Sequence, residues 1–179
     1  RGNALKALTQ LEAAVADHDR AIAIKPDYAE AYYNRGNALK ELNQLEAAVA
    51  SFEKATAIKP NYADAHINQG NLLKELKRHG EAETAYRDAL RIKPDNARAL
   101  NNLGTLLMAL NRLGEAETAY RNALRIKPDY AEAHNNLGNL LKELKRHDEA
   151  ETTYRDALRI EPDYAEVLNN LGMLLMDLK

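Results

Sequence analysis

The chain of 179 residues contains no cysteine, no tryptophan and a single phenylalanine. The absence of cysteine rules out disulfide cross-links and thiolate chemistry, although it does not define a compartment. No apolar run approaches the ~20 residues of a transmembrane helix, so we expect no membrane contact. The formal net charge of -2 lacks the basic excess of nucleic-acid-binding surfaces, so no nucleic acid partner is expected.

Sequence patterns of catalytic sites are also scarce. Ser51 is the only serine and lies in no nucleophile motif, and no glycine-rich phosphate loop is present. The five histidines show no H-x-x-x-H spacing for a metal ion. We therefore predict no enzyme activity, no catalytic residue, no metal ligand and no cofactor. No signal peptide is visible, and a cytoplasmic location is expected, although a chain that begins with Arg1 does not define it.

A repeat of 34 residues dominates what is present. The prolines follow one another at this interval, and so do six of the eight glycines: Pro26, Pro60, Pro94, Pro128 and Pro162; Gly2, Gly36, Gly70, Gly104, Gly138 and Gly172. A fixed period between 20 and 50 residues indicates stacked units, each of which buries its apolar face against its neighbours.

The apolar spacing inside one unit is helical. In residues 97–110 the leucines recur at intervals of three and four, and a polar break follows at Asn111 and Arg112. A second helical run ends at Lys127, because proline disfavours helical backbone in the residue before it. We expect Asp129 to cap the next helix, which begins near Ala131. Each unit is thus predicted to be two antiparallel helices joined by a tight turn, in an all-α fold.

The residues at fixed places in the repeat resemble the tetratricopeptide repeat family. In residues 29–62 the family pattern is carried by Tyr32, Gly36, Leu39, Ala48, Phe52, Ala55 and Pro60. The resemblance implies a right-handed superhelical solenoid of antiparallel helix pairs. It divides a single array, residues 1–179, into a partial unit 1–28, the units 29–62, 63–96, 97–130 and 131–164, and a partial unit 165–179.

Small residues at positions eight, twenty and twenty-seven of a unit allow helices to approach, and an aromatic residue at position twenty-four fills the gap between them. Tyr86, Tyr120 and Tyr154 are therefore predicted to be core residues. In the first unit His18 occupies the place of this aromatic residue.

The resemblance implies that a stripe of the first helix lines a concave, peptide-binding surface. Position six is asparagine in every unit that contains it, and positions nine, twelve and thirteen are often Asn, Lys and Glu. An asparagine amide can pair with any peptide backbone, because it is both donor and acceptor. This column resembles the asparagine ladder in the repeat arm of O-linked N-acetylglucosamine transferases. A structural use of the position-six asparagine, in fixing the geometry between helices, is the alternative. The predicted peptide-binding residues are Asn34, Asn37, Lys40, Glu41, Asn68, Asn71, Lys74, Asn102, Asn136, Asn139, Lys142 and Asn170.

Neither end shows a polar capping helix, so we expect the last helix, residues 165–179, to expose an apolar face that includes Leu171, Leu174, Leu175 and Leu178. Either the chain is a segment of a longer array, or its terminal helices associate end to end with other copies. The leading hypothesis is a non-catalytic scaffold that binds a protein or an extended peptide. The alternatives are a substrate-recruiting arm of a larger enzyme, such as a glycosyltransferase, and a structural protein that assembles into filaments.

Overall fold

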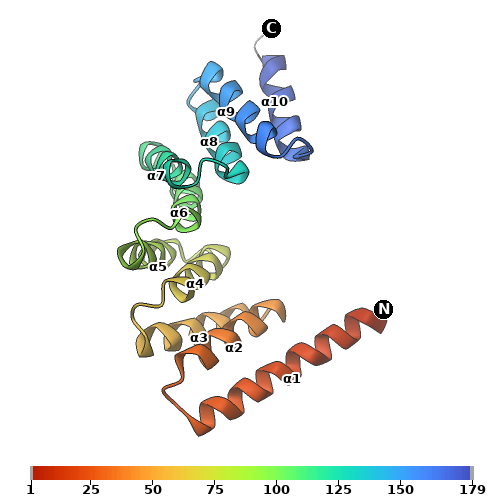
Figure 1. Cartoon of the computed structure of the whole chain (residues 1–179), viewed down its shortest axis with the longest axis vertical. Helices are drawn as coiled ribbons and strands as arrows, with labels where there is room; N and C mark the ends of the chain where they lie inside the picture. The colour runs from red at the N-terminus through yellow and green to blue at the C-terminus, as the bar shows by residue number, and fades with distance from the viewer. Residues whose placement is uncertain (1, 178–179) are drawn as a thin grey trace. The chain divides into compact units, whose positions relative to one another are not determined.

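The computed structural model describes the backbone of residues 2–177 and the side chains of residues 8–177. The described backbone is all helical, as predicted, and has ten helices and no strand (Figure 1). Their bounds are α1 (Gly2–Ile24), α2 (Ala29–Glu41), α3 (Leu45–Ile58), α4 (Ala63–Glu75), α5 (His79–Ile92), α6 (Ala97–Ala109), α7 (Leu113–Ile126), α8 (Ala131–Glu143), α9 (His147–Ile160) and α10 (Ala165–Asp177).

The chain divides into two compact units, Arg1–Pro94 and Asp95–Lys179, and the division falls in the connection between α5 and α6. In the first unit each helix packs against the next, from α1 to α5. In the second unit the same succession runs from α6 to α10, and α8 also contacts α6 and α10 directly. We call α2, α4, α6, α8 and α10 the A-type helices, and α3, α5, α7 and α9 the B-type helices. The single continuous array over residues 1–179 stays a prediction.

Each complete A-type helix ends in the same left-handed turn. The residue after the C-cap has a positive φ, between 57° and 59°, at Asn43, Lys77, Asn111 and Lys145. In the first of these turns the backbone N–H of Gln44 donates to Leu39 O at 2.9 Å and that of Asn43 to Lys40 O at 2.9 Å. These two bonds satisfy carbonyls that the helix end would leave unpaired. The B-type helix therefore starts at once and runs antiparallel.

The first repeat differs from this pattern. The predicted helix pair is wrong there, because α1 is one uninterrupted helix through the expected turn (Figure 1). Thr9 stands where the other repeats place the residue of positive φ. A β-branched residue fits the left-handed region poorly, so Thr9 disfavours the turn that the complete repeats form.

The core lies between the paired helices, where a glycine of the A-type helix faces an aromatic ring of the B-type helix. Phe52, Tyr86, Tyr120 and Tyr154 are all buried, as predicted. A Cβ added at Gly138 would lie 2.5 Å from Cε1 of Tyr154, so only glycine leaves room for the ring. The alanines at positions twenty and twenty-seven are buried on either side of each ring.

Two predictions about single residues are wrong. The N-cap of α8 is Tyr130, without a side-chain cap, and not Asp129. The cap does appear in α6, where Asn96 accepts a hydrogen bond from the backbone N–H of Ala99 at 3.0 Å. Leu174 is buried and not exposed, because it lies on the face of α10 that packs against the preceding repeat. Leu178 lies outside the described residues.

Candidate peptide-binding face

The twelve predicted binding residues lie on α2 and α4 of the first unit and on α6, α8 and α10 of the second. On each helix they fall at positions six, nine, twelve and thirteen, and we call this set the A-helix stripe. Asn34, Lys40 and Glu41 are exposed, and the other nine residues are half-buried. The stripe therefore contacts solvent within each unit.

The position-six amides join neighbouring A-type helices. Nδ2 of Asn136 donates to Oδ1 of Asn101 at 3.0 Å. Nδ2 of Asn170 donates to Oδ1 of Asn135 and of Asn139, both at 3.1 Å. Asn68 makes the corresponding contact in the first unit, where its Nδ2 lies 3.0 Å from Oδ1 of Asn37 and 3.3 Å from the hydroxyl of Tyr33.

The same amides keep part of their hydrogen-bonding capacity. Oδ1 of Asn68, Asn136 and Asn170 has no hydrogen-bond donor among the described residues. An asparagine carbonyl accepts two hydrogen bonds, and its amino group donates two. Each of these side chains therefore has its orientation fixed by a neighbouring repeat and retains an acceptor for another partner.

The position-nine residues connect the stripe to the core. The buried Tyr86 and Tyr154 donate their hydroxyl protons to Oδ1 of Asn71 at 2.8 Å and of Asn139 at 2.7 Å. In the repeat between them Thr105 takes this place, with its hydroxyl 3.3 Å from that of Tyr120. Burial raises the pKa of Tyr154 to about 12, so the phenol stays protonated and continues to donate.

Two asparagines at position five are central to this network, although the prediction did not include them. Asn101 and Asn135 are each only 1% exposed. Their Nδ2 atoms donate to Oε1 of Glu132 at 3.0 Å and of Glu166 at 2.9 Å, each on the next A-type helix. A signal was available in the sequence, because both asparagines are followed 31 residues later by glutamate, whereas Ile67 is followed by Arg98.

Comparison with known proteins settles the family. The model of the TPR repeat matches residues 2–43, 36–77 and 70–110, and a second model, described as tetratricopeptide repeat, matches residues 95–163. The chain belongs to the tetratricopeptide repeat family. No curated protein matches it in sequence.

Solved structures with the tetratricopeptide fold resemble most of the chain. A crystal structure of MamA is 20% identical, with a TM-score of 0.81 over 87% of this chain and 91% of that one. The thermophilic TPR protein TTC0263 of Thermus thermophilus is 24% identical, with a TM-score of 0.74 over 98% and 95%. At these identities the likeness shows the fold alone. YrrB, described as a TPR protein with an unusual peptide-binding site, is 25% identical, with a TM-score of 0.77 over 93% and 86%.

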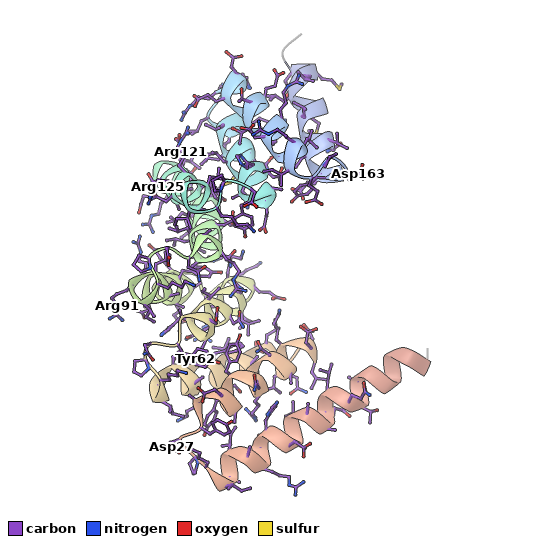
Figure 2. The ribbon with its side chains drawn as sticks, in the orientation of Figure 1. Asp27, Tyr62, Arg91, Arg121, Arg125 and Asp163 are labelled. Carbon is purple, nitrogen blue, oxygen red and sulfur yellow. The ribbon has the colours of Figure 1, made fainter. Side chains whose placement is uncertain are left out.

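Tyrosines outside the core line the first tetratricopeptide unit beside its stripe. The rings of Tyr33 and Tyr62 stack with centroids 4.8 Å apart, and the hydroxyl of Tyr33 accepts a hydrogen bond from Asn68. Tyr62 is labelled in Figure 2. Nζ of Lys59 lies 4.7 Å from the centre of the Tyr62 ring. These aromatic surfaces lie next to the amide column and were not part of the prediction.

The stripe carries charges of both signs. Nζ of Lys142 lies 3.4 Å from a carboxylate oxygen of Asp177, and Nζ of Lys40 lies 3.9 Å from one of Glu41. Because both pairs contact solvent, each contributes little to stability. These side chains can orient a ligand, because they place a hydrogen-bond donor and an acceptor beside the amides.

Two histidines of this tetratricopeptide chain, His66 and His134, contact backbone carbonyls. Nε2 of His66 and of His134 donates to the carbonyl of Pro60 at 3.1 Å and of Pro128 at 2.9 Å. A carbonyl can only accept, so the proton lies on Nε2 in both rings. Within the described residues, no three His, Asp or Glu side chains form a metal site. No helix of the described part combines the length and hydrophobicity that crossing a bilayer requires.

Proposed function

We propose that this chain is a protein-interaction module that holds an extended peptide along the A-helix stripe. The main support for the proposal is the hydrogen bonding of the position-six side chains Asn68, Asn136 and Asn170. Each is fixed by a hydrogen bond to the preceding repeat and keeps its carbonyl oxygen for another partner. Such pre-organised groups bind a backbone without losing further side-chain entropy.

The peptide backbone is the chemistry that best fits a column of amides. Asparagine recognises the N–H and C=O groups that every peptide has, so affinity does not require one sequence. Exposed lysines and glutamates beside the column would then select among charged side chains. The family supports a role in protein binding, and the peptide-binding site described for the structural neighbour YrrB supports a peptide as ligand. The recruiting-arm and filament alternatives stay predictions.

The test is a titration of extended peptides against the double variant Asn102→Ala with Asn136→Ala. Each lost hydrogen bond is worth roughly 1 kcal/mol net, so we expect about a thirtyfold loss of affinity for the pair. Isothermal titration calorimetry over a panel of unrelated sequences measures it. Unchanged affinities in the double variant would show that the stripe does not bind the peptides.

A stability control is needed, because Asn136 also links two repeats. Asn135→Ala removes the bonds to Glu166 and Asn170 but leaves the position-six amides in place. We expect this variant to be less stable and to bind peptide with an affinity within a few-fold of the original chain. An equal loss of affinity in both variants would indicate loss of repeat geometry and not of a ligand contact.

A further inference from the structure

A groove between the B-type helices α7 and α9 is formed by residues outside the A-helix stripe. Its cavity has a volume of about 410 Å³, and α8 contributes His134 and Leu137 to its lining. On α9 the lining residues Asp148, Thr152 and Asp156 follow one another at intervals of four, so they lie on one side of that helix. All three helices belong to the second unit, so the groove lies within one compact body.

The uncharged polar side chains of this lining offer acceptors and not donors. The hydroxyl of Thr152 donates to the carbonyl of Asp148 at 2.9 Å, and the hydroxyl of Thr153 donates to that of Glu149 at 2.7 Å. His134 donates from Nε2 to a backbone carbonyl, so its Nδ1 carries a lone pair. A ligand that meets these three side chains must therefore supply the protons of the hydrogen bonds.

The charged side chains of the lining leave one carboxylate without a partner. The guanidinium of Arg121 already lies 3.2 Å from a carboxylate oxygen of Glu149. Asp156 lies 3.0 Å from Arg159 through one of its two oxygens. Asp148 is exposed and makes no ion pair among the described residues. A cation in the groove would compensate Asp148, whereas an anion would be repelled by it.

Thr153 places a polar atom deep in the same groove. This residue is only 9% exposed, and no described residue donates a hydrogen bond to its oxygen. A hydroxyl oxygen has two lone pairs, so Thr153 offers an acceptor at a place that the helix fixes. Other repeats bury Ala85 or Ala119 at this position. The packing of the helix pair therefore does not require the hydroxyl.

Two nearly identical repeats differ at this groove. Residues 63–96 and 131–164 differ at seven of 34 positions, and three of the seven differences concern lining residues of the groove. The three pairs are Gln69 and Leu137, Gly80 and Asp148, and Ala85 and Thr153. The corresponding groove of the first unit, between α3 and α5, has a cavity of about 280 Å³. The groove of the second unit is thus larger, and it alone has the unpaired carboxylate and the buried hydroxyl.

We propose that this groove binds the guanidinium group of an arginine in a basic segment of a partner protein. A guanidinium has five donors and no acceptor, so it matches a lining that offers lone pairs. Its charge compensates Asp148, and the apolar part of the arginine side chain packs on the buried Leu137. Arginine is preferred over lysine, because its planar group donates to two acceptors at once. The groove shares no residue with the A-helix stripe, so this assignment is independent of peptide binding there.

The experiment titrates the full chain, labelled with ¹⁵N, with short peptides Gly-Ser-Xaa-Ser-Gly in which Xaa is arginine, lysine or citrulline. Citrulline keeps the shape of arginine and removes its charge. Backbone amide shifts in NMR spectra give the affinity and locate the contact. We expect saturable shifts at residues 148–156 and binding about tenfold tighter for arginine than for citrulline, because hydrogen bonds to a charged group are lost. Lysine should lie between them. Equal affinities for arginine and citrulline, or for arginine and lysine, would overturn the proposal.

Two variants test the acceptors of the groove. Asp148→Asn removes the unpaired carboxylate, and Thr153→Ala removes the buried oxygen. Both should fold, since Asp148 is exposed and alanine occupies the position of Thr153 in other repeats. We expect about tenfold weaker binding of the arginine peptide to Asp148→Asn. Thr153→Ala should weaken it severalfold. Unchanged affinity in both variants would contradict the proposal.

Asp163→Asn is the matched control. It removes the same charge from an exposed residue between α9 and α10 that does not line the groove (Figure 2). Its affinity for the arginine peptide should be unchanged, and so should that of Asn102→Ala with Asn136→Ala. An equal loss in Asp163→Asn and Asp148→Asn would indicate non-specific attraction by the net charge. That result, or amide shifts confined to the A-helix stripe, would contradict the assignment.

Discussion

At the scale of single residues, the helix packing depends on glycines, which have no Cβ. Each glycine of the pairs Gly36–Phe52, Gly70–Tyr86, Gly104–Tyr120 and Gly138–Tyr154 leaves space that the ring fills, with Cβ-to-ring distances of 2.5 to 2.8 Å. Real carbon atoms do not approach so closely, and the rings are buried and cannot withdraw. Glycine is therefore required at these four places by contact and not by backbone conformation.

Gly138→Ala is expected to destabilise the chain, because the added methyl overlaps the Tyr154 ring. Overpacking costs about 1–3 kcal/mol, and the better helix propensity of alanine offsets up to about 1 kcal/mol of that. Gly172→Ala is the matched control: it meets no described atom and should stabilise α10 by about 0.5–1 kcal/mol. Urea unfolding monitored by circular dichroism measures both, and equal midpoints would refute the contact argument.

A second residue-scale prediction concerns the buried amide of Asn135. Replacing Asn135 by alanine removes the hydrogen bond that its amide donates to Glu166. It also removes one of the two hydrogen bonds that Asn170 donates to α8. We expect a loss of about 1–3 kcal/mol in the free energy of unfolding. Asn169→Ala removes an exposed amide whose Nδ2 lies 3.6 Å from the sulfur of Met173, and should change stability by less than about 0.5 kcal/mol. The same unfolding measurement compares the two, and similar losses would mean that burial of the amide is unimportant.

At the scale of elements, the turn after each A-type helix decides whether a helix pair forms. The four turns hold Asn43, Lys77, Asn111 and Lys145 with positive φ, and asparagine tolerates this region better than most residues do. Thr9 at the equivalent place in α1 coincides with a continuous helix. We therefore expect the residue at this place to influence whether a repeat forms a helix pair.

Asn43→Thr should therefore strain the turn between α2 and α3. A β-branched residue in the left-handed region costs about 1–2 kcal/mol, which should appear as a lower urea midpoint. Asn43→Gly keeps the turn accessible and should be neutral or slightly stabilising. Hydrogen exchange at residues 44–48 should increase in the threonine variant alone. A threonine variant with unchanged stability and exchange would rule out the turn as the cause of the difference in α1.

At the scale of the whole molecule, arginines join B-type helices through carboxylates whose pKa values are lowered. Arg146 lies 2.8 Å from Glu117 of α7 and 2.7 Å from Glu149 of α9. The hydrogen bond from Arg146 lowers the pKa of Glu149. Burial raises the pKa of Glu117, but hydrogen bonds from Arg121 and Arg146 outweigh it and the net pKa is lowered. The pKa values of Glu30 and Glu81 are lowered as well, by Lys59 and Arg78.

Because the folded chain holds these pKa values below those of the unfolded chain, their stabilisation is present at neutral pH. It is lost as the pH falls below about 4.3, the ordinary value for glutamate, and through the lowered folded values. Arg146→Gln should be less stable than the original chain near neutral pH, and the difference should shrink in acid. Arg125→Gln is the control, since Arg125 makes no ion pair among the described residues and projects from α7 (Figure 2). Urea midpoints measured across this pH range test this prediction. A difference in stability between Arg146→Gln and the original chain that persists in acid would contradict the ionic explanation.

Much of the fold and part of the candidate site could be predicted from the sequence. The glycine and proline intervals and the leucine spacing predicted the helix pairs of the complete repeats, because helix periodicity and turn residues are local signals. The core tyrosines followed from the same register. The positions of the A-helix stripe also followed from the repeat register. The hydrogen-bond partners of the asparagines in the stripe did not.

The sequence alone determined the repeat, the complete helix pairs and the small-residue and aromatic positions, since each depends on neighbours within one or two helical turns. Only the tertiary structure decided that Asn101 and Asn135 join successive A-type helices, that Leu174 is buried while Leu175 remains exposed, and that α1 continues past Thr9. The amide contacts join residues 31 and 35 positions apart, so they depend on how one helix pair stacks on the next. Stacking geometry is set by the packing of all the side chains together, which no local spacing specifies.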